Sequence, residues 1–267
     1  MNQCSYYGME YDPFIKNTKD VIIDTSEARE VRYRLDYLKE IKGFGLLTGQ
    51  PGRGKTTAVR AWASTLNSSL YKVIYIPLST TTVQEFYRQL ASGLGAEPAF
   101  RKVDNFRTIQ DTVTRYALEK KITPVIILDE ANYMSNGILN DLKLLFNFSM
   151  DSRDRAVVLL TGLPQLNNTL RLNVHEPLRQ RIVMNYDMDG LSREEAREYV
   201  LKKMEQASCR KNVFEESALE AVINSGNGTM RIINRICENC LLLGYHEKKE
   251  IIDTDIVMKA VNDMELS

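Results

Sequence analysis

The sequence is poor in the residues that build disulfide frameworks and metal centres. Its 267 residues include four cysteines and two histidines. Cysteines this sparse exclude a small fold held together by disulfides, and they are typical of a reducing, cytoplasmic compartment. Cys237 and Cys240 form a C-x-x-C pair, but no second pair and no histidine accompany them. We therefore predict no metal site and expect both thiols to face the core of a helical region.

Net charge and long apolar runs are also missing. Lys and Arg number 35, Asp and Glu number 35, and the formal net charge is zero. This balance argues against a uniformly basic nucleic-acid coat, although a local basic patch is compatible with it. Apolar runs such as 125–128 and 156–160 are far shorter than the roughly 20 residues that span a bilayer. The first residues show no signal peptide, so we expect neither a leader nor a membrane span.

Short apolar runs alternate with helical patterns over the first two thirds of the chain. The runs predict strands at 45–48, 71–77, 124–129, 155–161 and 181–186. Between or before them lie predicted helices at 27–42, 55–66, 83–94, 106–121 and 138–150. Nearly continuous apolar strands separated by helices favour an α/β fold with a parallel sheet covered on both faces.

Strand signals stop after Gly190. Ser192 with Glu195 three residues later has the pattern of a capping box at a helix start. Helical patterns follow at about 215–224, 229–245 and 254–264. We therefore expect an N-terminal segment over 1–26, an α/β core over 27–189 and a small all-helical domain over 190–267.

A glycine-rich loop follows the first predicted strand and opens a predicted helix. Residues 49–56 read Gly-Gln-Pro-Gly-Arg-Gly-Lys-Thr and fit the phosphate-loop pattern at every defined position. Such a loop wraps phosphates with backbone N–H groups, while Lys55 reaches the terminal phosphates and Thr56 holds Mg²⁺. The alternative is a chance glycine-rich turn. The predicted nucleotide-binding residues are Gly49, Gln50, Pro51, Gly52, Arg53, Gly54, Lys55, Thr56, Thr57 and Asp129.

Two carboxylates follow the third predicted strand, in the sequence Val-Ile-Ile-Leu-Asp129-Glu130. A buried parallel strand delivers its last residues to the carboxyl edge of the sheet, where ligands of α/β folds bind. Asp129 is the predicted Mg²⁺ ligand together with Thr56, and Glu130 is the predicted group that polarises an attacking water. An ordinary strand end with solvated acids is the alternative. The adjacent Glu favours ATP hydrolysis over transfer to a small-molecule hydroxyl.

The order of these motifs resembles an AAA+ ATPase over nearly the whole chain. The resemblance implies a P-loop NTPase sheet of strand order 5-1-4-3-2, a helical lid, and protomers in a ring or filament with ATP at each interface. It places Thr161 at the sensor-1 position and Arg231, in Gly226–Arg231, at the sensor-2 position. Either Arg179 or Arg181 matches the segment that carries the arginine finger. Ordinary surface salt bridges are the alternative for these arginines.

Further motifs are similar to the ExeA-like ATPases, which overlap the TniB, TnsC and MuB transposition regulators. They are Tyr6-Tyr7-Gly8-Met9, Pro13-Phe14, the phosphate loop, Leu-Asp-Glu-Ala, Leu-Thr-Gly-Leu-Pro-Gln-Leu and Arg-Gln-Arg-Ile. The opening segment resembles a stretch that packs near the nucleotide, with Tyr11 or Phe14 against the adenine. Burial of these rings in the core is the alternative.

This resemblance implies a DNA transposition helper. Such a protein binds ATP and Mg²⁺, oligomerises on double-stranded DNA without sequence preference, engages a transposase and possibly a target-selection adaptor, and is reset by hydrolysis. The alternative is an ExeA-like ATPase that regulates a protein complex, such as a secretion pathway, without contacting DNA. A small-molecule kinase is disfavoured by Glu130 and the helical lid.

Residues 101–121 are the candidate DNA-binding surface, because they carry six basic and three acidic side chains. Repeated around an oligomer, this excess could contact phosphates without sequence preference. The predicted contacts are Arg101, Lys102, Lys120 and Lys121. A solvated helix face with mixed charges is the alternative.

Overall fold

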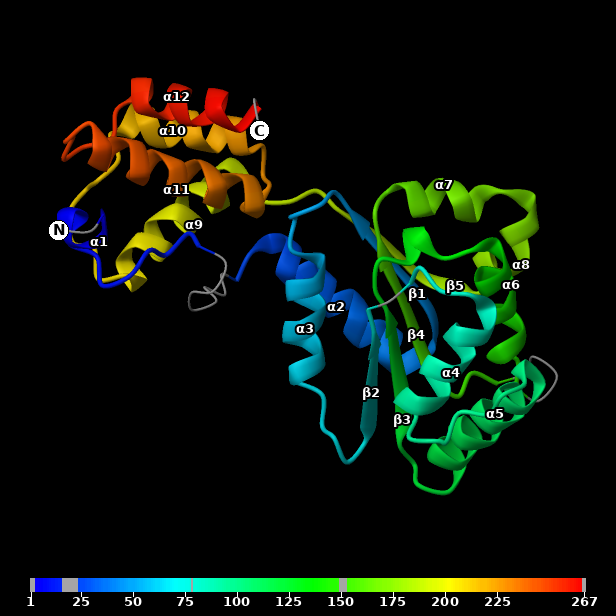
Figure 1. Cartoon of the computed structure of the whole chain (residues 1–267). Coiled ribbons are helices and arrows are strands. Elements are labelled where there is room, and N and C mark those ends of the chain that lie inside the picture. The colour runs from blue at the N-terminus through cyan, green and yellow to red at the C-terminus, as the bar shows by residue number, and fades with distance from the viewer. Residues whose placement is uncertain (1–2, 16–23, 78, 149–152, 266–267) are drawn as a thin grey trace. The chain divides into compact units, whose positions relative to one another are not determined.

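The computed structural model describes the chain except for residues 1–2, 16–23, 78, 149–152 and 266–267 (Figure 1). The described chain divides into two compact units. One, the sheet unit, comprises residues 28–50 and 55–188, and the other, the helical unit, comprises residues 1–27, 51–54 and 189–267. Each unit is described by itself.

The sheet unit is built on five parallel strands in the order β2-β3-β4-β1-β5. This arrangement confirms the predicted order 5-1-4-3-2. The strand bounds are β1 Gly43–Gly49, β2 Tyr71–Ile76, β3 Thr123–Leu128, β4 Val157–Gly162 and β5 Ile182–Met188. Every residue of β1 is buried, because β1 lies between β4 and β5 and helices cover both of its faces.

Helices lie on both sides of the sheet, with α2 and α3 on one side and α4 to α8 on the other (Figure 1). Their bounds are α2 Ser26–Ile41, α3 Lys55–Ser64, α4 Val83–Gly93, α5 Lys102–Leu118, α6 Asn136–Leu145, α7 Gln165–Arg171 and α8 Glu176–Arg179, with short 3-10 turns η1 Ala131–Tyr133 and η2 Asn173–His175. Side chains alternate along β1, so Phe44 and Leu46 pack in one core layer and Leu47 in the other. At Gly45 a Cβ would lie 2.4 Å from Leu38 Cδ2, so only glycine lets α2 pack this closely.

The bounds of α5 differ from the prediction of a helix over 106–121. The helix begins at Lys102 because the buried Asn105 side chain ties down the preceding loop, accepting from Ala99 N at 2.8 Å and donating to Ala99 O at 3.0 Å. It ends at Leu118, where Lys121 takes the left-handed conformation and Ile122 N bonds back to Tyr116 O. Such a reversal ends a helix and satisfies its last carbonyls.

The predicted helix over 138–150 begins two residues early and ends early. Ser135 caps α6, its hydroxyl accepting from Ile138 N at 3.4 Å. The helix stops at Leu145, and positions 149–150 of the predicted span lie outside the described residues. The short helices α1, α7 and α8 were not predicted, since segments of four to seven residues carry too little periodicity to stand out.

The helical unit contains α1 Gln3–Tyr7, α9 Arg193–Gln206, α10 Glu216–Gly226, α11 Met230–His246 and α12 Thr254–Glu265. The capping box before α9 is confirmed in both halves, since Glu195 N donates to Ser192 Oγ at 3.2 Å and Ser192 N donates to Glu195 Oε2 at 3.0 Å. Cys237 and Cys240 are buried in this unit's core, and burial raises the pKa of Cys240 to about 12. These thiols therefore stay protonated.

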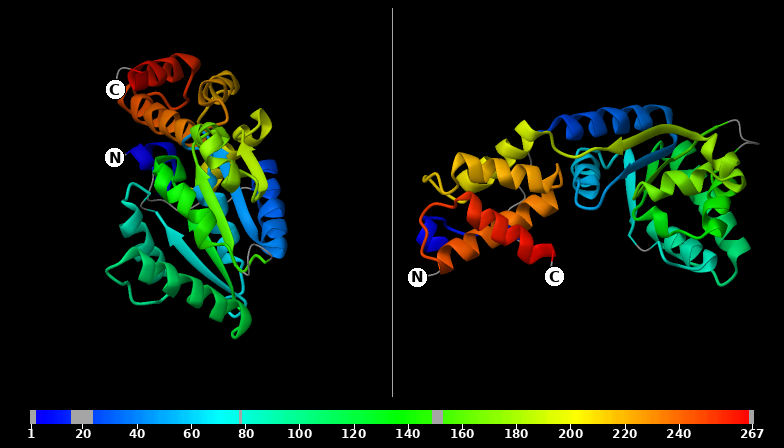
Figure 2. Two further views of the ribbon diagram at one scale, coloured as in Figure 1. Left: turned by 90° about the vertical axis from the view of Figure 1, so that its right-hand side faces the viewer. Right: turned by 90° about the horizontal axis from the view of Figure 1, so that it is seen from above.

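The described part of the N-terminal segment packs into the helical unit. The blue helix α1 lies beside α11 in both views of Figure 2. Tyr7 and Phe14 are 1% and 3% exposed in the same core. Lys203 Nζ donates to Pro13 O at 2.5 Å and lies over the Phe14 ring. Part of the segment predicted to pack near the nucleotide, residues 1–2 and 16–23, lies outside the described residues.

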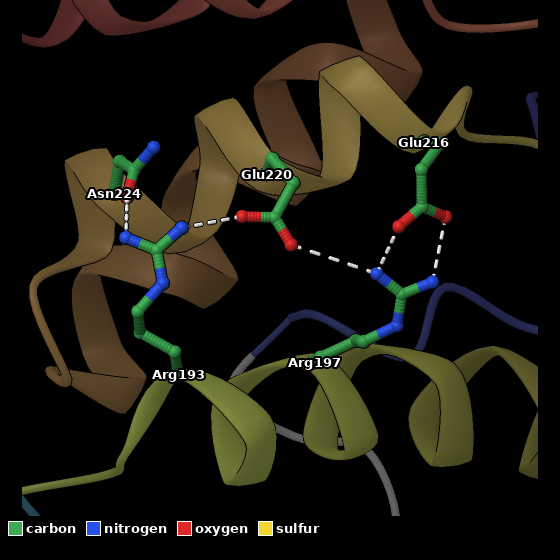
Figure 3. A network of polar contacts seen from close by, with 5 residues as sticks. All are labelled: Arg193, Arg197, Glu216, Glu220 and Asn224. Atoms are coloured by element: carbon green, nitrogen blue, oxygen red, sulfur yellow. Dashed lines mark hydrogen bonds and ion pairs between the residues drawn. The ribbon is translucent and has the colours of Figure 1, made fainter.

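A polar network links α9 to α10 on the surface of the helical unit (Figure 3). Arg197 forms a two-pronged ion pair with Glu216, and Arg193 Nη2 lies 2.5 Å from Glu220 Oε2. Arg193 also donates to Asn224 Oδ1 at 2.7 Å. Exposed pairs like these contribute little stability individually, so the network chiefly fixes how the two helices align.

In the part of the chain that the structure describes, no helix has both the length and the apolar character that crossing a membrane requires.

Candidate nucleotide-binding site

The phosphate loop joins the end of β1 to the start of α3, as predicted. Lys55 is the first residue of α3 and only 7% exposed. Its Nζ donates to Gly49 O at 2.7 Å and to Gln50 O at 3.1 Å. The loop backbone therefore curls around the ammonium group, which places Lys55 where phosphates bind in such loops. Thr56 and Thr57 follow in the first turn of α3, and both are exposed.

The base of the loop is anchored from two sides. Thr48 Oγ1 donates to Asp187 Oδ1 on β5 at 2.7 Å and accepts from Asn167 Nδ2 on α7 at 2.8 Å. These bonds fix the carboxyl end of β1, where the loop begins.

The loop tip, residues 51–54, belongs to the helical unit. Gly52 and Gly54 have φ of +80° and +95°, which side chains rarely adopt. Arg231, at the start of α11, donates its backbone N–H to Gly52 O at 3.4 Å, and a Cβ on Gly52 would lie 2.6 Å from Arg231 Cβ. Arg53 Nη1 lies 3.8 Å from Asp189 Oδ1. The predicted sensor-2 residue therefore lies directly against the loop tip, while its role toward ATP stays a prediction.

Asp129 is the most heavily hydrogen-bonded group at the carboxyl edge of the sheet. It is 5% exposed, directly after β3. Oδ2 accepts from Thr56 Oγ1 at 3.2 Å and from Tyr75 Oη at 2.7 Å. Oδ1 accepts from the Thr161 hydroxyl and from Glu130 N at 3.0 Å. The structure thus brings together Thr56 and Asp129, the two predicted metal ligands, and adds Thr161 and Tyr75.

These oxygens fit a magnesium ion. Mg²⁺ prefers hard oxygen ligands, usually one or two carboxylates, with waters and substrate phosphates completing the shell. Asp129 and Thr56 supply a carboxylate and a hydroxyl within hydrogen-bond distance of each other, at the start of the helix that follows the phosphate loop. They are the residues that would hold the ion, which would neutralise phosphate charge and polarise the bond to be broken.

Tyr75 is a member of the site that sequence reasoning missed. It lies on β2 beside β3, paired in register with Ile127, two residues before Asp129. Burial, with the bond to Asp129 as the second cause, raises the pKa of Tyr75 to about 12, so the phenol keeps its proton at neutral pH. The predicted strand order already placed the second strand beside the third. The signal that could have identified Tyr75 was therefore a polar side chain near the carboxyl end of that second strand.

A cavity of about 270 Å³ adjoins Asp129 on the α3 side of the sheet. Its polar lining includes Thr56, Arg60, Tyr75, Asp129 and Thr161, and its apolar lining comprises Val59, Ala63, Val73 and Ile127. Val73 and Tyr75 on the edge strand β2 are 39% and 50% exposed. The cavity therefore connects the carboxylate to the open face of the edge strand.

Glu130 takes a left-handed backbone conformation, with φ 51° and ψ 38°. This is uncommon for a residue with a side chain and is often found at functional sites. The turn leaves the Glu130 side chain exposed directly beside the buried Asp129. Its neighbour Asn132 accepts from Leu163 N at 2.9 Å and so ties this turn to the end of β4. An exposed carboxylate here is open to water, as a water-polarising group requires.

The two candidate finger arginines have different surroundings. Arg181 Nη1 donates to Lys143 O at 3.1 Å and to Phe146 O at 3.5 Å, so its guanidinium caps the carboxyl end of α6. Arg179 is the last residue of α8 and is exposed. The structure therefore assigns Arg181 a contact within its own unit and leaves Arg179 presented to solvent.

The four predicted DNA contacts do not form one patch. Arg101 and Lys102 lie at the start of α5, and Lys120 and Lys121 lie beyond its end. A helix of 17 residues separates them by about 25 Å. Lys102 Nζ lies 2.5 Å from Asp141 Oδ2, and Lys120 lies over the Tyr116 ring. The helix thus carries a pair of basic residues at each end.

Comparison with known proteins yields a match to an AAA domain, a curated secretion protein and solved structures of the same fold. A family model described as an AAA domain matches residues 39–170. General secretion pathway protein A of Aeromonas hydrophila is 27% identical over 261 residues, which are 96% of this chain and 47% of that protein. The chain thus spans about half the length of this curated relative.

Solved structures with the same fold include Cdc6p of Pyrobaculum aerophilum, with a TM-score of 0.69 at 15% identity over 93% of this chain and 69% of that one. The Aeropyrum pernix ORC1 protein in complex with DNA gives 0.65 at 17% identity over 96% and 69%. The RuvB Holliday junction branch migration motor of Thermotoga maritima gives 0.59 at 21% identity over 94% and 73%. At these identities the likeness shows the fold alone.

The fold is therefore that of a P-loop AAA+ protein with a helical C-terminal part. The AAA domain match supports nucleotide binding and an ATPase of the AAA+ class at a general level. The similarity to general secretion pathway protein A supports the ExeA-like part of the predicted group. The TniB, TnsC and MuB part stays a prediction.

The burial of His175 was not predicted from the sequence; this residue is 0% exposed in η2, directly before α8, the helix that ends at Arg179. Its Nδ1 lies 3.1 Å from Asn140 Oδ1 and its Nε2 2.9 Å from Asn136 Oδ1. Neutral imidazole has a single N–H, so one of the two amides must turn its NH₂ group toward the ring. Burial lowers the pKa of His175, so the ring is neutral in the folded protein at neutral pH.

We predict that His175 makes the protein less stable in mild acid. The unfolded chain binds the proton near pH 6.5 and the folded chain only at lower pH, so stability is full above about pH 6.5 and falls as pH drops. One proton contributes a slope of at most about 1.4 kcal/mol per pH unit. Denaturant unfolding between about pH 7 and pH 5 should show a shallower slope in His175→Gln.

The control is His246→Gln, which changes an exposed histidine and should keep the wild-type slope. Carboxyl groups titrate in all three proteins and cancel in the comparison. Parallel pH curves for wild type and His175→Gln would contradict the prediction.

Proposed function

We propose that the chain is an ExeA-like ATPase module whose nucleotide state regulates a protein assembly, such as a secretion complex. The observation that carries this proposal is the junction of β1 and α3, where Lys55 lies inside the phosphate loop and Thr56 contacts Asp129. The 27% identity to general secretion pathway protein A over 96% of this chain supports this choice of partner class.

In the proposed reaction, the loop backbone and Lys55 bind the phosphates of ATP. Asp129 and Thr56 hold Mg²⁺, which spreads the charge on the phosphates. Glu130, exposed beside Asp129, orients the water that attacks the terminal phosphate. Thr161 keeps Asp129 in place through its hydroxyl. Arg231 and an arginine from a second protomer stabilise the charge that develops during transfer.

One prediction of this proposed function separates nucleotide binding from ATP turnover. Lys55→Ala should abolish binding of a fluorescent ATP analogue, because the ammonium group that faces the phosphates is lost. Glu130→Gln should bind with wild-type affinity but hydrolyse at least about 100-fold more slowly, because the amide is a poor base. Equilibrium fluorescence titration and phosphate release measure the two effects. Wild-type turnover by Glu130→Gln would remove Glu130 from its role.

Another prediction of this proposed function concerns the exposed Arg179. We infer that Arg179 acts on ATP bound by a neighbouring protomer, so Arg179→Ala should keep nucleotide affinity and lose about 1,000-fold or more of the turnover of the assembled protein. Arg181→Ala is the matched variant. It removes the contacts to Lys143 O and Phe146 O and should chiefly lower stability. Full turnover by Arg179→Ala in an oligomer, or by wild type as a monomer, would contradict this inference.

The second candidate function is the DNA transposition helper, favoured by the motif resemblance and by the basic residues at both ends of α5. Such a protein would assemble with ATP on double-stranded DNA and engage a transposase.

Duplex DNA separates the two candidates. ATP turnover and particle size should not change with DNA if the protein regulates a protein complex. If the helper function holds, DNA should promote assembly in an ATP-dependent and salt-sensitive way. Charge reversal of Lys120 and Lys121 should then weaken that assembly, while reversal of two exposed lysines of the helical unit, Lys211 and Lys248, outside the candidate surface, should not.

A further inference from the structure

The hydrogen-bonding capacity of Asp129 is used up. A carboxylate offers about four lone-pair positions. Oδ1 accepts hydrogen bonds from Thr161 Oγ1 and Glu130 N, and Oδ2 accepts them from Thr56 Oγ1 and Tyr75 Oη. An added ligand, whether a metal ion or a water on it, therefore has to displace one of these four donors.

Tyr75 is the donor that can leave most easily. Thr161 is 1% exposed in β4, and the Glu130 N–H belongs to the same turn as Asp129 itself. Thr56 is fixed at the start of α3 and is itself a fitting metal ligand. Tyr75 belongs to the edge strand β2, is 50% exposed, and lines the 270 Å³ cavity next to Asp129. Its phenol can swing away without moving core atoms.

The Tyr75 Oη to Asp129 Oδ2 distance is 2.7 Å, an ordinary length for a hydroxyl donor. The acceptor of this hydrogen bond is a carboxylate. Such bonds are about twice as strong as those between neutral groups. Losing this hydrogen bond therefore costs free energy, which reduces the net binding free energy of a ligand at the same oxygen.

We propose that Tyr75 is a positioning residue that holds Asp129 Oδ2 in the nucleotide-free protein and competes with Mg²⁺ for that oxygen. Tyr75 thereby sets the Mg²⁺ concentration at which the ion strengthens nucleotide binding. This inference rests on the proposed nucleotide site. It concerns only the coupling between metal and nucleotide, and it assigns Tyr75 no contact with the reacting atoms.

The test uses equilibrium binding and needs no turnover. A fluorescent ADP analogue is titrated against the whole chain at a series of Mg²⁺ concentrations, and the Mg²⁺ midpoint of the affinity increase is measured. Tyr75→Phe keeps the ring and removes the competing hydroxyl. Its midpoint should fall about three- to tenfold, the change expected for loss of one hydrogen bond to a charged group after partial replacement by water. Affinity without Mg²⁺ should stay within about twofold.

The matched control is Tyr71→Phe. Tyr71 lies on the same strand and packs under the Lys39 ammonium group, away from Asp129. It should keep the wild-type midpoint. Tyr75→Leu, which removes hydroxyl and ring together, should shift the midpoint in the same direction as Tyr75→Phe. Emission from Trp62, the one tryptophan, reports whether each variant is folded, since Trp62 is 1% exposed in the core of the sheet unit.

Two failures can be told apart. If the wild-type chain binds no nucleotide at any Mg²⁺ concentration, the proposed function is wrong. If the wild type binds and the Tyr75→Phe curve coincides with it or moves to higher Mg²⁺, the competition inference is overturned and the phenol supports the metal-bound state instead.

Discussion

Burial of β1 is the constraint on which the site depends. All seven residues of this strand are buried, between β4 and β5 and beneath helices on both faces. A shift of one residue would move every side chain of this strand to the opposite core layer, so that Phe44 and Leu46 would have to fit where Leu47 packs now. The chain that leaves its carboxyl end is therefore delivered to a fixed point, and Thr48 secures that point through Asp187 and Asn167. The phosphate loop can be glycine-rich and still well placed because its base does not move.

The sequence was sufficient for the strands, their order and the residues of the phosphate loop. The strands and the loop depend on local patterns, namely apolar runs and a motif of fixed spacing, whereas the strand order was implied by the family resemblance. The bounds of α5 were missed because they depend on a buried side chain, Asn105, which bonds to a loop six residues earlier. No periodicity in a single sequence reports such a contact.

The candidate site was predictable in its motif residues and unpredictable in what surrounds them. Asp129 was found from its position after an apolar strand, but its bond to Tyr75 joins residues 54 apart in sequence. The sequence likewise left Arg179 and Arg181 as equal candidates, and the contacts of Arg181 with backbone carbonyls at the end of α6 were visible only in the structure. In both cases the added information is tertiary, because pairs of distant polar groups leave no mark on composition or spacing.

The make-up of the helical unit has a consequence for how the chain comes to be folded on the ribosome. This unit combines residues that precede the sheet unit with residues that follow it, and Tyr7 and Phe14 share a core with Ile256 and Ala260. The residues of the sheet unit emerge between them. During synthesis the sheet unit can complete its core first, while the N-terminal aromatic residues wait for α12. The core of the helical unit is therefore completed only after α12 has been made.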